Sequence, residues 1–340
     1  MTLGTEDSNE VGDGLGAGAG LEVITMGRVS VDLYPEQIGV PLHEVRSFRK
    51  ALGGSATNVA VQAARLGRRS AVITKVGNDA FGVYVRKALD GFGVDARYVG
   101  TDYRHRTPLV FCEVFPPDDF PLLFYREPKA PDTEIEISDL DLSTISQAPL
   151  FWTTGTGLSS EPSRSSTLAA LRSRKSGVTV HDLDYRPVFW PSEQEAQRWA
   201  REALRHATVA VGNVDEARMA TGLHDPPEQS RALLDLGVEI AIVKKGGDGV
   251  HARTAEGVTE VCPIPVNVLN GLGAGDAFGG ALCHGLLLGW GLDDVLRVAN
   301  AAGALVSTRL LCADDMPAMD EIEGLLGEPA PAGGHTGTKT

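Results

Sequence analysis

The chain has 340 residues, 42% of them hydrophobic and 22% charged, a composition that is ordinary for a globular protein. Its formal net charge of −14 argues against binding to a nucleic-acid backbone, so a bound anion must be held by helix N-termini, single arginines or a metal ion. The four cysteines lie far apart and form no CxxC pair, which excludes a disulfide framework or cysteine-rich metal site and favours a reducing cytoplasm.

The two ends of the chain differ from its middle. Residues 1–20 are acidic and rich in glycine, without the basic start and apolar stretch of a signal peptide. No run reaches the roughly 18 apolar residues of a membrane span. We therefore expect flexible tails over residues 1–20 and 328–340, and one domain over residues 21–327.

Between the tails, short apolar runs alternate with helical patterns. Strands are predicted over residues 21–27, 70–77, 149–155, 177–182, 208–213 and 238–246. Helices are predicted over residues 58–67, 79–93, 161–175 and 193–206. This alternation indicates an α/β fold with a mainly parallel sheet flanked by helices, whose ligands bind at the carboxyl ends of the strands.

Two segments interrupt the alternation. Residues 30–52 and 103–126 contain prolines and few helix signals, so they are predicted to be extended. They predict a small β-sheet flap, which either forms a lid that excludes water from a site or only covers a sheet edge.

The stretch "LNGLGAGDAFGGAL" (269–282) places glycines around one acid. The G-x-G-x-x-G fingerprint fails, because its sixth place falls on Asp276 or Phe278, and no G-K-[ST] follows as in a P-loop. We expect a glycine turn before a helix, with the amides of Gly273, Ala274 and Gly275 forming an anion hole. From spacing alone, Asp276 is either a general base beside that hole or a helix cap.

Four motifs in order carry a resemblance to a known family. They are "GGSATNVAVQAARLG" (53–67), "GNVDE" (212–216), "VKKGGDGV" (243–250) and "NGLGAGDAF" (270–278). Together they resemble the ribokinase-like (PfkB-type) carbohydrate kinases from about residue 23 to 320. The resemblance implies a Rossmann-like ribokinase fold with a small β-sheet lid, and transfer of the γ-phosphate of ATP to a sugar hydroxyl with Mg²⁺.

The resemblance also assigns roles to individual residues. Asp276 would be the catalytic base and the turn before it the anion hole. Asn213 and Glu216 match the Asn-x-x-Glu element that places Mg²⁺, with Glu216 acting through water. The sugar clamp would consist of Asp32, Gly53, Gly54 and Asn58, and the nucleotide would contact Lys245, Gly246, Gly249 and Asn300.

One departure from the family concerns a monovalent cation. The family commonly has Asp-Thr where this chain has Asn270 and Gly271, which weakens the expectation of a K⁺ site. Because lid strands in this family often pair between subunits, the resemblance also allows a homodimer through the lid.

Two arginines bear on the acceptor. Arg126 and Arg186 each have an aromatic neighbour and lie in segments expected near the acceptor. Because a guanidinium binds a carboxylate through two parallel hydrogen bonds, the two arginines favour a sugar acid over a neutral sugar as acceptor. The alternative is ordinary surface ion pairing. The segments 27–54 and 182–187 resemble the branch of the family that phosphorylates 5-dehydro-2-deoxygluconate, a sugar acid of inositol breakdown.

Other functions stay open from sequence. The acceptor could instead be 2-dehydro-3-deoxygluconate, fructose or ribose, although 2-dehydro-3-deoxygluconate kinases more often have Asn where this chain has Asp184. A non-catalytic sugar or nucleotide sensor is a weaker alternative, since base and anion hole are both present. A nicotinamide-dependent oxidoreductase lacks its fingerprint here.

Overall fold

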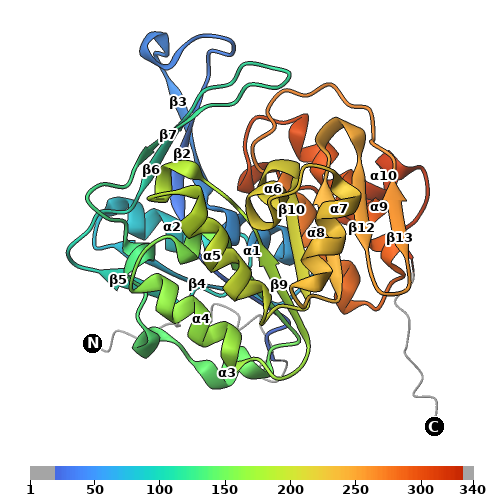
Figure 1. Ribbon diagram of the computed structural model, residues 1–340. Helices are drawn as coiled ribbons and strands as arrows, with labels where there is room; N and C mark the ends of the chain where they lie inside the picture. The colour runs from blue at the N-terminus through green and yellow to red at the C-terminus, as the bar shows by residue number, and fades with distance from the viewer. Residues whose placement is uncertain (1–19, 332–340) are drawn as a thin grey trace, which may run out of the picture.

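The computed structural model describes residues 20–331, and these form two sheets of different size (Figure 1). The large sheet has nine strands in the order β13-β12-β11-β10-β9-β8-β1-β4-β5. Its strands are β1 (Val23–Met26), β4 (Ser70–Gly77), β5 (Val99–Asp102), β8 (Leu150–Thr154), β9 (Val178–Asp182), β10 (Val209–Asn213), β11 (Ile240–Lys244), β12 (Val250–Arg253) and β13 (Val258–Val261).

From β5 across the sheet through β4, β1, β8, β9 and β10 to β11, neighbouring strands run parallel, which confirms the predicted mainly parallel sheet. At one end of the sheet, β12 pairs antiparallel with β11 and with the edge strand β13, and the sequence analysis did not anticipate this hairpin. Both are only four residues long, and only β12 alternates apolar with polar residues, so their sequences are too short to distinguish from a loop.

Helices cover both faces of the large sheet (Figure 1). Val23 and Ile24 of β1 illustrate why, because successive strand residues enter the cores on opposite faces. One face carries α1 (Ser55–Arg65), α2 (Ala80–Gly91), α8 (Ala274–Leu287), α9 (Leu292–Ser307) and α10 (Met319–Leu326). The other carries α3 (Leu142–Gln147), α4 (Ser163–Ser173), α5 (Glu193–Leu204), α6 (Val214–Thr221) and α7 (Pro226–Asp235).

Close packing of α8 depends on its small residues. A side chain at Gly279 would meet the Trp152 ring, and one at Gly280 would collide with Gln62 of α1. The absence of side chains lets α8 approach both α1 and the sheet, which fixes the position of its N-terminus.

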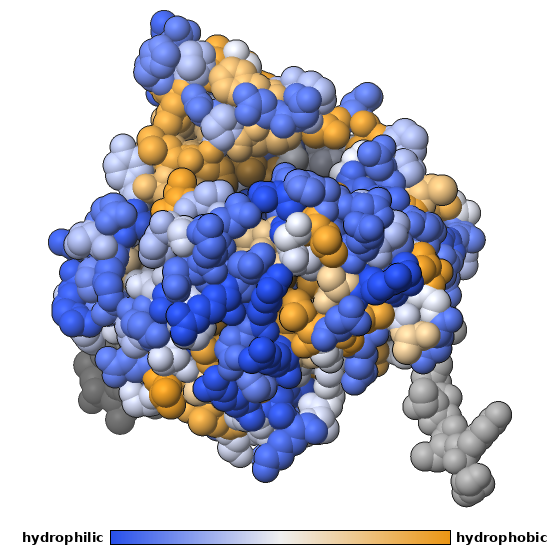
Figure 2. Space-filling view, in the orientation of Figure 1, coloured by the Kyte–Doolittle hydropathy of each residue, from blue (hydrophilic) through white to orange (hydrophobic). Residues whose placement is uncertain are grey.

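The small sheet projects from the body, at the top left in Figure 1. Its order is β3-β2-β6-β7, with β2 (Ser30–Pro35), β3 (Phe48–Gly53), β6 (Leu109–Cys112) and β7 (Leu122–Tyr125). These strands come from the two segments predicted to be extended, with β3 ending one residue beyond. Figure 2 shows apolar side chains in the hollow beneath it. Its action as a lid stays a prediction.

The predicted tails lie almost entirely outside the described residues. Residues 328–331 are described and contain no helix or strand. Between residues 20 and 331, no helix is both long and apolar enough to cross a membrane.

Candidate active site

The carboxyl ends of the parallel strands meet the start of α8, as expected for an α/β sheet. Asp182 ends β9, Asn213 ends β10 and Lys244 ends β11. Arg28 follows the end of β1 by two residues. Backbone register pairs Asn213 with Lys244, so these side chains start from adjacent positions at this edge.

The glycine turn forms the N-terminus of α8. Gly273 has φ 82°, and a Cβ there would lie 2.6 Å from Cys312 Sγ, so both conformation and space favour glycine. The first intrahelical bond runs from Ala277 N to Gly273 O at 2.9 Å. The amides of Gly275 and Asp276 therefore precede the helical ladder and are available to an anion. The Ala274 amide, a predicted donor, already donates to Gly271 O at 3.4 Å.

Asp276 lies in the first turn of α8, beside these amides. Its Oδ2 accepts a hydrogen bond from Asn58 Nδ2 at 2.8 Å, which brings two predicted site residues together from α8 and α1. Burial raises the pKa of Asp276 to about 6, while the Asn58 hydrogen bond lowers it. A carboxylate with this pKa is ionised at neutral pH and basic enough to take a proton.

The predicted sugar clamp surrounds Asp32, on β2. Ser30 Oγ donates to Asp32 Oδ1 at 2.6 Å, and Asp32 is only 8% exposed. A Cβ on Gly53, which lies on the neighbouring strand β3 and pairs with Ser30, would collide with the Asp32 carboxylate. Gly54 has φ 103° and its Cβ would collide with the Arg28 carbonyl. Gly53 therefore lets β3 approach the aspartate closely, and Gly54 lets the start of α1 approach the Arg28 backbone.

The two predicted acceptor arginines differ in their surroundings. Arg126 Nη2 donates to Asp132 Oδ1 at 2.9 Å and to Oδ2 at 3.2 Å, so one nitrogen of its fork is held in an internal ion pair, while its Nη1 is buried without a hydrogen-bond partner. Arg186 Nε lies 3.3 Å from Asp184 Oδ1, and its side chain is 40% exposed. Asp184 is buried and accepts from Ser55 Oγ and Thr156 Oγ1.

Lys245 differs from the other predicted nucleotide residues, because it does not line the cavity that they share. The Lys245 ammonium donates to Glu260 Oε2 at 2.8 Å, whereas the preceding Lys244 lines the cavity beside α8. Lys244 Nζ lies 3.1 Å from the position of a Cβ built on Gly275. Burial lowers the pKa of Lys244, but Asp182, Glu216 and other carboxylates outweigh it and raise that pKa. Lys244 is the last residue of β11, whereas Lys245 lies just beyond the strand, where its side chain reaches Glu260 of β13.

Asn213 and Glu216 form a capping box at the start of α6. Asn213 Oδ1 accepts from Glu216 N at 2.9 Å, and Glu216 Oε2 accepts from Asn213 N at 2.7 Å. This is a structural role, and Glu216 Oε1 makes no hydrogen bond within the described chain. Burial raises the pKa of Asp182 well above its usual range, opposed by Lys244 and reinforced by Glu216.

Asp182 and Glu216 are suited to a Mg²⁺ ion whose remaining ligands come from the substrate phosphates and water. Over residues 20–331 no three His, Cys, Asp or Glu residues cluster as a complete metal cage. Mg²⁺ commonly uses one or two carboxylates together with phosphates and water, and Asp182 with Glu216 can supply the carboxylates.

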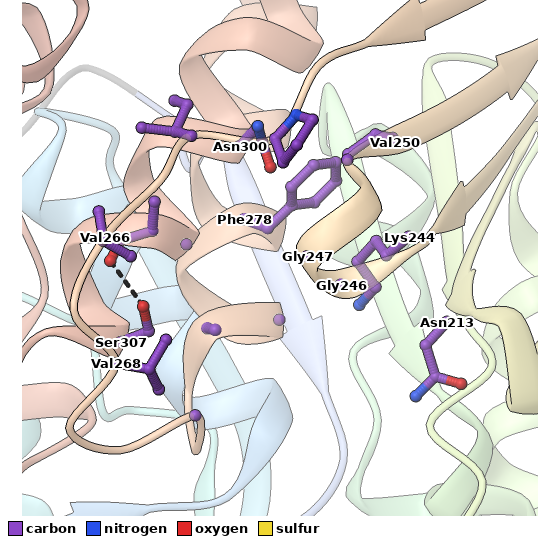
Figure 3. Close-up of a pocket in the computed structure, with 18 of the residues that line it drawn as sticks. Asn213, Lys244, Gly246, Gly247, Val250, Val266, Val268, Phe278, Asn300 and Ser307 are labelled. Carbon is purple, nitrogen blue, oxygen red and sulfur yellow. Dashed lines mark hydrogen bonds between the residues drawn. The ribbon is translucent and has the colours of Figure 1, made fainter. Parts of the chain in front are cut away.

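A cavity of about 560 Å³ adjoins Lys244 and the start of α8. Figure 3 shows Asn213 and Lys244, from adjacent strands, and Phe278, from α8, in its wall. The predicted nucleotide residues Gly246, Gly249 and Asn300 also line it, and Asn300 Nδ2 donates to Cys262 O at 3.0 Å. Apolar residues of the 263–268 loop complete the wall, a composition that suits a purine base.

Asn270 has a structural role in the glycine turn. It is fully buried, its Oδ1 accepts from Leu272 N at 3.0 Å, and its Nδ2 donates to Leu310 O at 2.7 Å. An amide here supplies no negative charge, which is in keeping with the weakened expectation of a K⁺ site.

Three residues of the site escaped the sequence analysis: Arg28, Asp182 and Lys244. Each follows or ends a parallel strand at the edge where ligands bind, and that placement was a usable signal. All three lie inside segments that carry the resemblance (27–54, 182–187 and 243–250), but the resemblance assigned roles only to other residues of those segments.

The model of the pfkB family carbohydrate kinases matches residues 21–319. The chain belongs to this family. Membership confirms the predicted resemblance, the ribokinase-like fold and the class of enzyme, a sugar kinase.

Relatives of this pfkB kinase include two bacterial proteins named 5-dehydro-2-deoxygluconokinase. The one from Geobacillus thermodenitrificans is 34% identical over 311 residues, covering 89% of this chain and 92% of the relative. The one from Clostridium perfringens is 33% identical over 310 residues, covering 89% and 91%.

Solved structures of sugar kinases share the fold. A putative ribokinase II from E. coli in complex with ATP and Mg²⁺ has TM-score 0.82 and 25% identity, covering 90% of this chain and 99% of that one. A fructokinase from Vibrio cholerae, in a form with fructose, ADP and calcium ion, has TM-score 0.80 and 28% identity with the same coverage.

Proposed function

We propose that this pfkB kinase transfers the γ-phosphate of ATP to a hydroxyl of 5-dehydro-2-deoxygluconate, as a step of inositol breakdown. The observation that carries the reaction type is Asp276, whose carboxylate stands between the open amides of α8 and the predicted sugar clamp. The names of the relatives at 33–34% identity support the acceptor. The cavity beside Lys244 supports a nucleotide as donor.

Asp276 acts as general base in this scheme. It accepts the proton of the acceptor hydroxyl as that oxygen attacks phosphorus, and the bond from phosphorus to the ADP oxygen breaks. The Asn58 hydrogen bond orients the carboxylate, and the pKa near 6 keeps it ionised at neutral pH.

The amides of Gly275 and Asp276 and the Lys244 ammonium stabilise charge on the transferring group. Phosphoryl transfer depends mainly on positioning and charge stabilisation, and these donors are fixed before substrate arrives. Asp182 and Glu216 would hold Mg²⁺, which when bound neutralises charge on the phosphates. Lys244 therefore offsets part of the acidic charge around a site that must receive an anion.

The remaining assignments follow the same scheme. Asp32 would bind acceptor hydroxyls, and the small sheet would close over the acceptor as a lid. A homodimer through this sheet stays a prediction from the family resemblance, and a cytoplasmic location stays a prediction from the cysteine pattern. The expectation of a K⁺ site stays weakened by Asn270 and Gly271.

The test is release of ADP, measured with purified protein over a panel of sugar acids and neutral sugars. We expect turnover only when ATP, Mg²⁺ and 5-dehydro-2-deoxygluconate are all present. Turnover of fructose or ribose without turnover of the keto acid would contradict the proposed acceptor. Binding of ATP and sugar without any ADP release would contradict the proposed catalysis.

A further inference from the structure

Arg28 is a buried cation without a hydrogen-bonding partner. It is 8% exposed, and within residues 20–331 its guanidinium makes neither a hydrogen bond nor an ion pair. Its Nε is fully buried and has no acceptor. The guanidinium carbon lies 5.8 Å from the centre of the Phe124 ring, on the strand β7 of the small sheet.

The other arginines at this end of the site are already paired. Arg126 is held by Asp132 at 2.9 Å, and Arg186 lies 3.3 Å from Asp184. Each of these guanidinium groups thus has an internal carboxylate, whereas Arg28 has none within contact distance.

Arg28 stands among the residues expected to bind the acceptor. Its carbonyl accepts from Thr57 Oγ1 at 3.2 Å and approaches Gly54, so its backbone is fixed against the start of α1. Burial raises the pKa of Asp32 and of Asp276, and the Arg28 charge lowers both, which places its guanidinium near the clamp and near the base.

A buried guanidinium without a partner is unfavourable, because it has lost water and gained no bonded anion. Its five donors form a planar fork that matches a carboxylate. Nearby Asp32, Asp184 and Asp276 are outside ion-pair distance, so the donors of Arg28 are open to a ligand.

We propose that Arg28 binds the carboxylate of the acceptor and so selects sugar acids over neutral sugars. The inference rests on the proposed function and adds the residue that reads the acid group. It also moves this role from Arg126, whose charge is already balanced by an ion pair with the buried Asp132.

The test compares Arg28→Met with Arg28→Lys and the wild type, using 5-dehydro-2-deoxygluconate and its carboxamide, in which a neutral amide replaces the carboxylate. Arg28→Met should raise the KM of the acid about 10- to 100-fold, the range expected for loss of hydrogen bonds to a charged group. The KM of ATP should not change. Arg28→Lys keeps the charge without the fork, so its effect should be intermediate.

The carboxamide separates carboxylate binding from a general effect on the site. Arg28→Met should turn over the carboxamide as well as the wild type does, so the preference for the acid should disappear. Arg97→Met serves as a control with the same chemical change, because Arg97 is an exposed arginine that pairs with Asp95 and belongs to none of the predicted site residues; it should keep that preference.

Several results would overturn the inference. One is an equal loss of activity toward acid and carboxamide in Arg28→Met; another is a raised KM for ATP with no change for the acid, which would place Arg28 at a phosphate. If Arg28→Met does not fold, an unchanged KM of the acid in Arg28→Lys would overturn it. A wild type that turns over only neutral sugars would instead contradict the proposed function.

Discussion

Replacing Asp276 by Asn should remove activity and increase stability at neutral pH. Asn keeps the size of the side chain, and its Oδ1 can still accept the hydrogen bond from Asn58 Nδ2. It cannot take a proton from the acceptor. Loss of a general base typically lowers turnover by about 10²- to 10⁴-fold.

The gain in stability follows from the cost of the buried charge. The folded protein raises the pKa of Asp276 from its ordinary value of 3.8 to about 6, chiefly by burial. Above pH 6 this shift lowers the free energy of unfolding by about 3 kcal/mol. Asn removes that cost and loses at most about 1 kcal/mol of favourable interaction with the helix dipole. The net gain expected at pH 7.5 is about 2 kcal/mol.

The stability difference between Asp276→Asn and the wild type should depend on pH. A raised carboxyl pKa leaves the stability of the wild type intact below pH 4 and reduces it as pH rises through 6. The advantage of Asp276→Asn should therefore fall from about 2 kcal/mol at pH 7.5 to about 1 kcal/mol at pH 4.5.

The assay is urea unfolding at both pH values, together with ADP release at pH 7.5. Asp235→Asn is the control, since Asp235 is an exposed residue at the end of α7 that undergoes the same chemical change. It should change neither quantity appreciably. Retained activity in Asp276→Asn, or a variant less stable than the wild type at pH 7.5, would refute the reasoning.

Three further predictions follow from the site. Lys244→Met should lower turnover about 100-fold or more by removing a cation at the transferring phosphate, whereas Lys245→Met should stay within a few-fold of the wild type. Equal effects of the two substitutions in steady-state kinetics would contradict the assignment of the phosphate contact to Lys244. Gly53→Ala should displace the Asp32 carboxylate, and it should therefore raise the KM of the acceptor much more than it raises the KM of ATP. Unchanged acceptor kinetics would argue against the predicted sugar clamp. The logarithm of kcat/KM should fall with decreasing pH below about 6, as Asp276 becomes protonated; a profile flat down to pH 5 would exclude Asp276 as the base.

Hydrophobic patterning was sufficient to predict most of the fold. The strand expected over 70–77 matches β4 residue for residue, because a long apolar run between two helical patterns leaves little ambiguity. The hairpin of β12 and β13 was missed, since short edge strands depend on pairing with a neighbour rather than on their own sequence.

The site was predicted less evenly than the fold. Motif residues such as Asp276 and Asn58 do meet, although they are 218 positions apart in sequence. The sequence could not show which of Lys244 and Lys245 lines the cavity beside α8, because that depends on the direction in which each side chain points at the end of β11. Nor could the sequence show that Arg126 has an internal partner in Asp132 and Arg28 has none.

A crystal structure with a non-hydrolysable ATP analogue and 5-dehydro-2-deoxygluconate tests the central claim most directly. We expect the terminal phosphate within hydrogen-bonding distance of the Gly275 and Asp276 amides, and an acceptor hydroxyl against the Asp276 carboxylate. A terminal phosphate bound away from the start of α8, or an acceptor hydroxyl out of reach of Asp276, would contradict the account.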